Sequence, residues 1–354
     1  MRQTSIDNIT KEMKLGKDIY SAEGRVLLAR GQELKAKYVE RLRNLGIYLV
    51  YIEDKRVADV EVKDLISEQT RREATRIIKD TMLSLKKKRA IIEVRGIKET
   101  VNEMVDEIIA NRHLLINLLD MRSYDDYLYN HSVGVCILSL TIGIAYKYDE
   151  LRLRDLGVGA LLHDVGKTKI SSEILNKPGK LTAEEFEEIK KHSRWGFDML
   201  RGEKELSLLS SHIAYQHHER CDGRGYPRGL SEEETLQFAR IVSVADVYDA
   251  LTADRIYRKR FLPHEARKII ESNLETQFSL QIVKIFFENV ALYPVGTMVK
   301  LSTGERGVVM KTERGFASQP QVRVLYNEKG EELERYRERN LREEPTISIT
   351  KVVE

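Results

Sequence analysis

The chain has too few cysteines for a disulfide framework, because its 354 residues include only Cys136 and Cys221. Without a CxxC spacing, both suit ordinary side chains in a reducing cytoplasm. The N-terminus has no apolar segment followed by a cleavage site, which excludes a signal peptide. No uncharged apolar run approaches the roughly 18 residues of a membrane span. The sequence therefore predicts a cytoplasmic protein without a membrane span.

The chain also lacks an excess of either charge. Its 59 basic and 56 acidic residues give a net charge of +3. This balance gives little support to a nucleic-acid duplex as partner, because such binding depends on neutralising phosphates. Apolar residues make up 42% and charged residues 32%, as in folded globular proteins and unlike disordered ones. The length allows two or three domains, each with its own core.

Residues 1–58 predict a small α/β module. Two short strands flank an Ala-Glu-Gly turn in "GKDIYSAEGRVLLARG", and "IYLVYIE" supplies a third strand. Between them, a helix in "ELKAKYVERLRNLG" ends at Gly46. The module contains no catalytic constellation, so a regulatory or packing role is favoured.

Residues 59–122 contain almost no glycine or proline and predict helix throughout. One buried helix face is indicated by apolar residues at helical spacing, namely Val101, Met104, Val105, Ile108 and Ile109. The basic run at 86–89 is interpreted as a solvated helix segment rather than an anion site. Long helices between modules commonly pair, so a homodimer through residues 59–122 is one alternative.

Residues 123–292 read as almost entirely helical and hold most of the histidines. A break follows at "LYPVG". Residues 293–354 then alternate apolar and polar residues, with turns at Ser-Thr-Gly and Asn-Glu-Lys-Gly, which predicts a small antiparallel sheet or barrel. The expected fold is mainly α, with a small α/β module at the N-terminal end and a small β module at the C-terminal end.

Several chemically active side chains lie in apolar helical runs of residues 123–292. His131 begins "HSVGVCILSLTIGIAYKY", and Val135 and Leu138 at i+4 and i+7 place it on the core side. His163 and Asp164 close another apolar helix, in "LGVGALLHDVGK". A carboxylate at that place is costly to bury unless it is paired or bound to a metal.

Three further segments add polar side chains to this set. In the helix that the Thr182/Glu185 capping box begins, His192 sits at the margin of the core side, which is marked by Phe186, Ile189, Phe197 and Leu200. His217 and His218 end the helix "SLLSSHIAYQ" before a glycine-rich turn. The helix in "ARIVSVADVYDALT" carries Asp246 and Asp249 on one face, at i, i+3 spacing.

Each of these residues alone favours an ordinary core or surface role. Jointly, the five histidines and two of the aspartates lie in or beside apolar helices that are expected to converge in a bundle. They form the mixed imidazole and carboxylate set of Fe, Mn or Zn sites, whereas Ca and Mg favour oxygen ligands. Seven ligands are too many for one tetrahedral ion, and a carboxylate such as Asp164 can bridge two ions. The hypothesis is a two-metal centre, which hydrolyses phosphate esters.

The sequence resembles the HD-GYP family of cyclic di-GMP phosphodiesterases, a subgroup of the HD-domain metal-dependent phosphohydrolases. The resemblance covers about residues 123–290 and rests on "HSVGV", "HDVGK", "KHSRWGFDML", "HHERCDGRGYP", "VADVYDALTADR" and "IYRKR". An HD dipeptide alone is a weak signal. HD-x-G-K followed by HHE-x-x-DG-x-GYP and AD-x-x-DA is very specific. The resemblance implies an all-helical HD-type bundle for the catalytic domain at 123–292.

The resemblance also implies a ligand set for two ions. One ion would be held by His131, His163, Asp164 and Asp246. Asp164 would bridge to a second ion held by His192, His217 and His218. Asp249 would orient a metal ligand or Lys167 from outside the coordination shell.

Substrate contacts are implied by the same resemblance. Lys167 would contact the scissile phosphate or assist the leaving oxygen. Arg255 and Arg258 would hold the phosphates of the substrate as bidentate donors. The pocket would be flanked by the loop residues Asp222, Gly223, Gly225, Tyr226 and Pro227.

The sequence departs from the family pattern at two places. Tyr127 stands where some members carry a glutamate for a third metal, so a third ion is not expected. Ile256 stands where proline is usual, which changes loop stiffness more than charge.

All ligands of the two-metal set are present, so the chain is interpreted as an active enzyme. It is expected to hydrolyse cyclic di-GMP to pGpG through a metal-bridged hydroxide, with further hydrolysis to GMP left open. Fe or Mn are the first choices of metal, with Zn, Co and Ni as alternatives. The rival functions are hydrolysis of another nucleotide or cyclic dinucleotide, and a non-catalytic binding or adaptor role. The flanking modules are candidates to bind protein partners.

Overall fold

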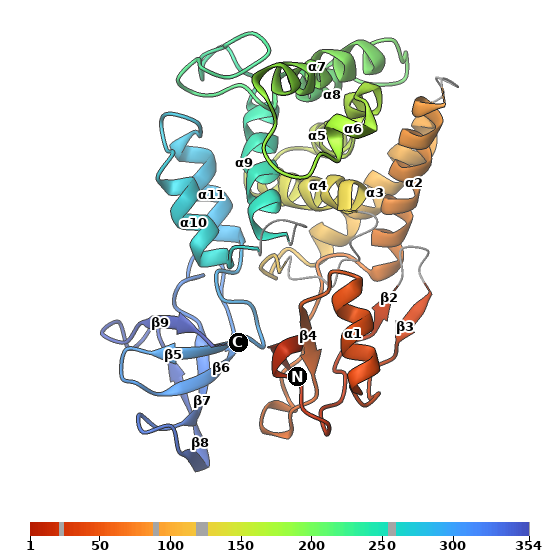
Figure 1. Cartoon of the computed structure of the whole chain (residues 1–354). Coiled ribbons are helices and arrows are strands. Elements are labelled where there is room, and N and C mark those ends of the chain that lie inside the picture. The colour runs from red at the N-terminus through yellow and green to blue at the C-terminus, as the bar shows by residue number, and fades with distance from the viewer. Residues whose placement is uncertain (21–24, 88–91, 118–126, 254–259, 354) are drawn as a thin grey trace. The chain divides into compact units, whose positions relative to one another are not determined.

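The computed structural model describes residues 1–20, 25–87, 92–117, 127–253 and 260–353. It shows a mainly helical chain with small β-sheets in its N-terminal and C-terminal parts (Figure 1). The chain divides into two compact units, of which the first comprises residues 1–64, 113–127 and 287–354, and the second residues 65–112 and 128–286. The predicted mainly α fold with small flanking modules is confirmed. The boundaries at 58/59, 122/123 and 292/293 stay a prediction.

The N-terminal part of the first unit contains two small antiparallel sheets. In one, β1 (Arg2–Ser5) pairs with β4 (Leu49–Ile52), and in the other β2 (Ile19–Tyr20) pairs with β3 (Val26–Leu28). The three strands predicted from the sequence are confirmed. Strand β1 was not predicted, because its four residues are mostly polar. The Ala-Glu-Gly turn between β2 and β3 lies outside the described residues.

Helical elements complete this part of the chain. Helix α1 (Ala36–Asn44) ends just before Gly46, whose φ of 70° is a conformation that glycine adopts without steric cost. Two short 3-10 helices are η1 (Ile6–Asn8) and η2 (Lys55–Val57). The predicted helix and its termination at glycine are therefore confirmed.

The C-terminal part of the first unit is an antiparallel sheet of five strands in the order β8-β7-β6-β5-β9. The strands are β5 (Met298–Leu301), β6 (Arg306–Lys311), β7 (Gln321–Tyr326), β8 (Glu332–Asn340) and β9 (Ile349–Val352). One core cluster of this sheet consists of the buried side chains of Val299, Leu301, Val309, Val322, Val324 and Leu341. The predicted antiparallel sheet is confirmed.

The two ends of the chain share part of one hydrophobic core. A buried cluster joins Val57 and Val60 to Met298, Val308 and Leu325. Charged side chains add to this contact: Arg323 forms an ion pair with Asp59 at 2.6 Å, and Arg56 donates a hydrogen bond to Tyr326 at 2.6 Å. The first unit is therefore assembled from segments that are far apart in the sequence.

The second unit is a bundle of helices. These are α2 (Glu68–Lys86), α3 (Val94–Ala110), α4 (Tyr127–Ala145), α5 (Glu150–Leu161), α6 (Ser172–Leu175), α7 (Ala183–Leu200), α8 (Leu208–Gln216), α9 (Gln237–Thr252) and α10 (Pro263–Glu271). Helix α11 (Leu280–Asn289) runs from this unit into the first. The 3-10 helix η4 (Val165–Lys169) follows α5.

Helices α2 and α3 occupy only part of the segment predicted to be helical throughout. Residues 60–67 and 111–117 are not helical, and α2 begins where the Ser67 side chain accepts a hydrogen bond from the Thr70 backbone N–H. The predicted buried face of α3 is confirmed for Val101, Met104, Val105 and Ile108, whereas Ile109 is half-buried. This apolar face is already covered within the second unit.

Helix α4 corrects one statement about membrane spans. The stretch Leu128–Ala145 has 18 residues, carries no charged side chain, and is long and apolar enough to cross a membrane. The expectation that no uncharged run approaches this length was therefore wrong. In the structure, 72% of the stretch is buried inside the protein, as in the core helix of a bundle. An all-round apolar sequence is what such a central helix requires.

The close approach of η4 and α7 depends on a glycine. A Cβ added to Gly166 would lie 2.0 Å from the His192 carbonyl oxygen and 2.6 Å from the Gly196 nitrogen. Both neighbours are backbone atoms, which cannot move without displacing the helix. Glycine at this position therefore lets the segment after α5 lie directly against α7.

Gly166→Ala is expected to lower the free energy of unfolding by about 1–3 kcal/mol, which is the usual cost of overpacking a core. The measurement is urea denaturation followed by circular dichroism. Gly202→Ala is the matched control, since its nearest backbone atom would be 3.5 Å from the added Cβ. Equal denaturation midpoints for the two variants would contradict the packing argument.

Candidate metal centre

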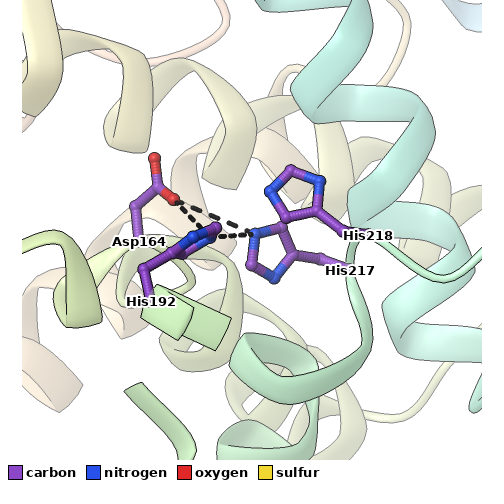
Figure 2. Close-up of side chains that lie close together, drawn as sticks. All are labelled: Asp164, His192, His217 and His218. Atoms are coloured by element: carbon purple, nitrogen blue, oxygen red, sulfur yellow. Dashed lines mark hydrogen bonds and ion pairs between the residues drawn. The ribbon is translucent and has the colours of Figure 1, made fainter. Parts of the chain in front are cut away.

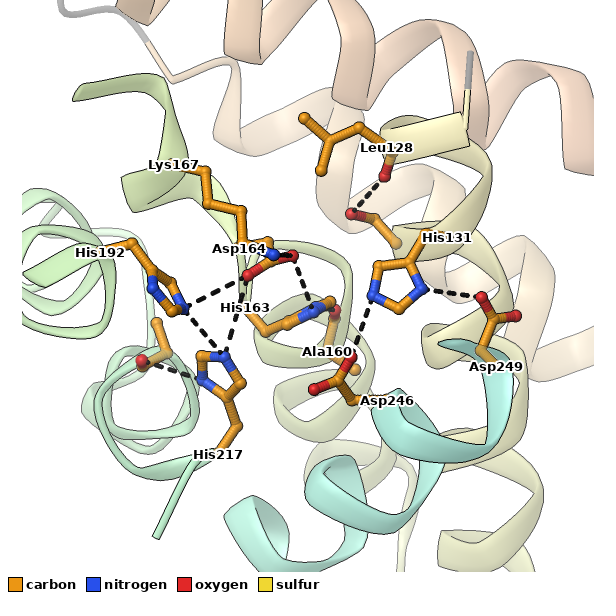
Figure 3. A network of polar contacts seen from close by, with 12 residues as sticks. Leu128, His131, Ala160, His163, Asp164, Lys167, His192, His217, Asp246 and Asp249 are labelled. Carbon is orange, nitrogen blue, oxygen red and sulfur yellow. Dashed lines mark hydrogen bonds and ion pairs between the residues drawn. The ribbon is translucent and has the colours of Figure 1, made fainter. Parts of the chain in front are cut away.

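Seven polar side chains converge in the second unit from five separate helices (Figure 3). His131 comes from α4, His163 and Asp164 follow α5, His192 lies on α7, His217 and His218 follow α8, and Asp246 lies on α9. These are all the residues that the sequence resemblance implied as metal ligands. Each helix contributes only one or two of them, so the centre exists only when the bundle is folded.

Asp164 belongs to two groups of candidate ligands at once. It clusters with His192, His217 and His218 on one side and with His131 and His163 on the other. Within each group, the potential ligand atoms lie within 4.8 Å of one another. Figure 2 shows the first group, in which the Asp164 carboxylate faces the imidazoles of α7 and α8. One carboxylate in two groups is the arrangement needed to bridge two ions.

The distances within the first group are short enough for a shared ion. The Oδ1 atom of Asp164 lies 3.4 Å from Nε2 of His192 and 3.9 Å from Nε2 of His217. The two Nε2 atoms are 3.3 Å apart. On the other oxygen, Oδ2 lies 3.4 Å from Nε2 of His163 and accepts a hydrogen bond from Lys167 at 2.5 Å.

The second group is completed by two aspartates of α9. Nε2 of His131 lies 3.0 Å from Oδ1 of Asp246, while Nδ1 lies 2.7 Å from Oδ2 of Asp249 (Figure 3). Asp249 is buried and reaches the imidazole from the side opposite Asp246. It is therefore placed to fix the orientation and tautomer of His131, as carboxylates commonly do for histidine ligands.

Three other histidines have their tautomer fixed by the backbone. Nδ1 donates to the carbonyl three residues earlier, at 2.7 Å in His163, 2.6 Å in His192 and 3.0 Å in His217. When Nδ1 carries the proton, Nε2 keeps its lone pair. The helical or turn geometry of each segment thus presents Nε2 toward Asp164.

Two buried polar atoms at the centre have no hydrogen-bond partner. They are Nε2 of His163 and Oδ1 of Asp164. Leaving a buried polar atom unpaired costs about 1–3 kcal/mol, so such atoms in a native structure require an explanation. Coordination to divalent ions satisfies both atoms, and the surrounding imidazoles and carboxylates are suitable donors. The residues present therefore fit a metal centre.

Burial keeps three of these histidines neutral, namely His192, His217 and His218. It lowers the pKa of His192 to about 4 and of His218 to about 3, and it holds the pKa of His217 well below its usual value. Neutral imidazole is the form that binds metal. At neutral pH these three side chains need lose no proton to act as ligands.

The two carboxylates stay ionised despite their burial. Burial alone would raise the pKa of Asp164, but the Lys167 ammonium and His163 hold that pKa well below its usual range. Burial would likewise raise the pKa of Asp246, and the hydrogen bond with His131 outweighs it. The centre therefore offers anionic oxygen beside neutral nitrogen donors.

The loop after His218 is tied to the centre by a buried glutamate that the sequence reasoning did not single out. Glu219 accepts backbone hydrogen bonds from Arg228 at 2.8 Å and from Leu230 at 2.9 Å. Its position directly after His217 and His218 could have indicated a role near the site. A glutamate in a polar loop, however, gives no reason to expect burial. The carboxylate of Glu219 therefore closes the loop that follows the candidate ligands His217 and His218.

Glycines and Tyr226 determine how closely this loop lies against the ligands. Gly223 has a φ of 72°, and a Cβ on Gly225 would lie 2.5 Å from the Arg220 nitrogen. The Tyr226 ring stacks on the imidazole of His218, with centroids 4.7 Å apart. Tyr226 is joined to Pro227 by a cis peptide bond.

Asp222 has local partners at the surface of the loop. It forms an ion pair with Arg220 at 2.9 Å and accepts a hydrogen bond from the Arg224 backbone. The hydrogen bond from Arg220 lowers the pKa of this carboxyl to about 2. Substrate contacts of the loop residues stay a prediction.

Some predicted site residues lie outside the described residues. These are Arg255 and Arg258, together with Ile256 between them. The side chain of Tyr127 is not described either. The phosphate contacts of the arginines and the expected absence of a third ion therefore stay predictions.

Helix α7 corrects two expectations about burial. The Phe186 side chain, expected on the core side, is 44% exposed. His192, expected at the margin and typical of a surface histidine when taken alone, is fully buried. The side of α7 that faces the bundle is set by the approach of η4 and α8, which the apolar pattern of the helix alone does not reveal.

Residues 103–281 match the HD domain family, and this segment is half of the 354-residue chain. The chain belongs to the HD domain family. The resemblance stated from the motifs and the predicted HD-type bundle are thereby confirmed. Residues 298–354 match a KOW domain associated with HD domain, which corresponds to the C-terminal sheet.

Relatives of this HD domain protein include named phosphodiesterases. The cyclic di-GMP phosphodiesterase PA4108 of Pseudomonas aeruginosa is 39% identical over 64% of this chain and 55% of its own length. A cyclic di-GMP phosphodiesterase of Thermotoga maritima is 37% identical over 58% of this chain and 55% of its own length. The 3'3'-cGAMP-specific phosphodiesterase 2 of Vibrio cholerae is 32% identical, over 54% and 37% respectively. The chain spans about half the length of the first two.

A solved structure shares the fold. Bd1817, a HDG"Y"P protein from Bdellovibrio bacteriovorus, superposes with a TM-score of 0.50 at 18% identity. The match covers 80% of this chain and 97% of the solved one. At this identity the likeness concerns the fold alone.

The lowered histidine pKa values predict acid sensitivity of the metal-free protein. The pKa of His192 is about 4 when folded and about 6.5 in an unfolded chain. Below pH 6.5 the unfolded chain therefore binds a proton that the folded chain does not, so stability falls as the pH drops from 6.5 to 4. The shift in this pKa corresponds to about 3 kcal/mol.

The measurement is urea denaturation of chelator-treated protein at several pH values from 7 to 4.5. His192→Gln is expected to make stability less dependent on pH over this interval. His113→Gln, at an exposed position, is the control and is expected to keep the full dependence. A wild-type stability that does not change between pH 6.5 and 4.5 would refute the assignment.

Proposed function

We propose that this chain is a metal-dependent phosphodiesterase that hydrolyses cyclic di-GMP to linear pGpG. The observation that carries the proposal is the single buried carboxylate of Asp164, which belongs to two groups of imidazole ligands. Relatives named as cyclic di-GMP phosphodiesterases support the substrate. The chemistry of the donors supports two ions, with Fe or Mn as first choices and Zn, Co or Ni as alternatives.

In this proposal, the ligands would divide between the two ions as the resemblance implies. His131, His163 and Asp246 would hold one ion, His192, His217 and His218 the other, and Asp164 both. When bound, the two ions would supply a nucleophilic water at neutral pH and neutralise charge on the phosphate. The protein places this chemistry among buried helices, where electrostatic interactions are stronger than in water.

Lys167 is the residue best placed to act on the substrate. Its ammonium is held 2.5 Å from Oδ2 of Asp164, and its side chain is 22% exposed, unlike the buried carboxylate it contacts. A cation at this position is suited to contact a phosphate oxygen and to give a proton to the departing ribose oxygen. The buried Asp249 positions His131 and does not itself touch the reacting atoms.

A second candidate substrate is 3'3'-cGAMP. The observation that favours it is the similarity to a 3'3'-cGAMP-specific phosphodiesterase of Vibrio cholerae. The ligand set described above recognises a phosphodiester and carries no information about the base. Cyclic di-GMP is preferred because two relatives with that name align over 231 and 206 residues, compared with 195 residues for the cGAMP-specific relative.

Further predictions accompany the main proposal. Cytoplasmic location, hydrolysis beyond pGpG to GMP, and protein partners of the flanking modules belong with it. A homodimer through residues 59–122 also stays a prediction. An adaptor that binds the nucleotide without cleaving it is the alternative from another functional class.

The decisive experiment combines metal content and activity in one sample purified without oxygen. Wild-type protein is expected to hold about two transition-metal ions per chain, as a binuclear centre requires, and to cleave cyclic di-GMP. Asp164→Ala is expected to lower the rate by more than about a thousandfold, since members of one catalytic unit are individually essential. Asp106→Ala, at an exposed site on α3, is the matched control.

Each outcome has a distinct meaning. Bound metal with cleavage of 3'3'-cGAMP alone would favour the second candidate. Bound metal without cleavage of any cyclic dinucleotide would favour the adaptor. Wild-type protein that holds no metal after reconstitution with Fe or Mn would contradict the proposal.

A further inference from the structure

An exposed aromatic side chain lies beside the metal centre. The Phe186 side chain of α7 is 44% exposed, and within the described residues it is the only phenylalanine exposed to this degree. Its ring packs edge-on against Tyr226, with centroids 6.3 Å apart and planes at 82°. Single exposed apolar side chains are common, but this ring contacts another ring that lies beside the candidate ligands, and it is accessible to an aromatic ligand.

Tyr226 links this exposed ring to the metal ligands. Besides the Phe186 contact, its ring stacks on His218 at 4.7 Å and lies edge-on to His192 at 6.4 Å. Phe186, Tyr226 and His218 therefore form a continuous row of rings. The row begins at a ligand of the centre and ends in solvent.

A cation accompanies the same row. The Nζ atom of Lys190, one helical turn after Phe186, lies 5.1 Å from the Phe186 centroid and 5.8 Å from that of Tyr226. Glu187 holds this ammonium at 2.5 Å. The rings of Phe186 and Tyr226 therefore lie beside the ammonium group of Lys190. Such a combination suits an anionic ligand with a flat aromatic group.

We propose that Phe186, supported by Tyr226 and Lys190, is a stacking platform for a nucleobase attached to the phosphate at the metal centre. This inference rests on the proposed function and adds an affinity-determining residue to it. A nucleoside bonded to the scissile phosphate extends outward from the ligands, and the row of rings offers it an aromatic surface. Every base has a π-face, so the platform contributes affinity without selecting guanine.

The surroundings favour a nucleotide over a protein partner on this ring. The other exposed large apolar residues described in the second unit are all aliphatic, namely Leu83, Leu151, Leu208, Leu209 and Leu280. Aliphatic side chains such as these cannot stack on a base as an aromatic ring does. Phe186 differs from them in having an aromatic neighbour that itself stacks on His218.

The test is calorimetric binding of GMP and of inorganic phosphate to protein reconstituted with Mn. Phe186→Ala is expected to weaken GMP binding by about tenfold, the effect of losing one base stack, with phosphate binding unchanged. Phe186→Trp is expected to restore GMP affinity, and AMP is expected to lose as much affinity as GMP. Leu209→Ala, a 40% exposed residue of α8, is the control.

The results separate the platform from the proposed function. Unchanged GMP affinity in Phe186→Ala, with phosphate bound normally, would overturn the platform and leave the metal-dependent phosphodiesterase standing. Equal weakening of GMP and phosphate would also overturn it, because that pattern indicates damage to the metal centre. Wild-type protein that binds neither ligand when loaded with Mn would overturn both inferences.

Discussion

The burial of one carboxylate governs the helical unit of this protein. Asp164 is withdrawn from solvent and kept ionised by the ammonium group of Lys167. An ionised group in such a place is expensive unless it is compensated. The helices therefore have to converge accurately, and close approaches such as Gly166 against α7 make that convergence possible. The polar centre therefore forms only when the helices pack correctly, and correct packing in turn requires that the charge of Asp164 be compensated.

The helical backbone prepares the centre as much as the side chains do. Carbonyl groups three residues earlier fix the tautomers of His163, His192 and His217, so each Nε2 is directed inward before any ion arrives. Burial lowers the pKa of His192 and of His217, which removes the competing proton from these two imidazoles. Binding a metal then requires little rearrangement, which is the usual advantage of preorganisation.

Motif spacing predicted the chemistry of the centre better than helix periodicity predicted the surroundings. Histidine and aspartate in apolar helices indicated a metal site, and the seven candidate ligands could be named because their motifs resemble those of the HD-GYP family. The exposure of Phe186 and the full burial of His192 could not be predicted in the same way. They depend on which neighbours α7 meets, and those neighbours are distant in sequence. Glu219 was missed for the same reason, since its backbone partners lie beyond the glycine-rich turn.

The shared core of the first unit has a consequence for biosynthesis. Val57 and Val60 leave the ribosome before the helices of the bundle, and their partners Met298, Val308 and Leu325 leave it after those helices. All helices of the HD domain are synthesised in between. The helical bundle can therefore fold before the segment that contains Val57 and Val60 has its packing partners. The first unit is completed only when the strands β5 to β7 have been synthesised.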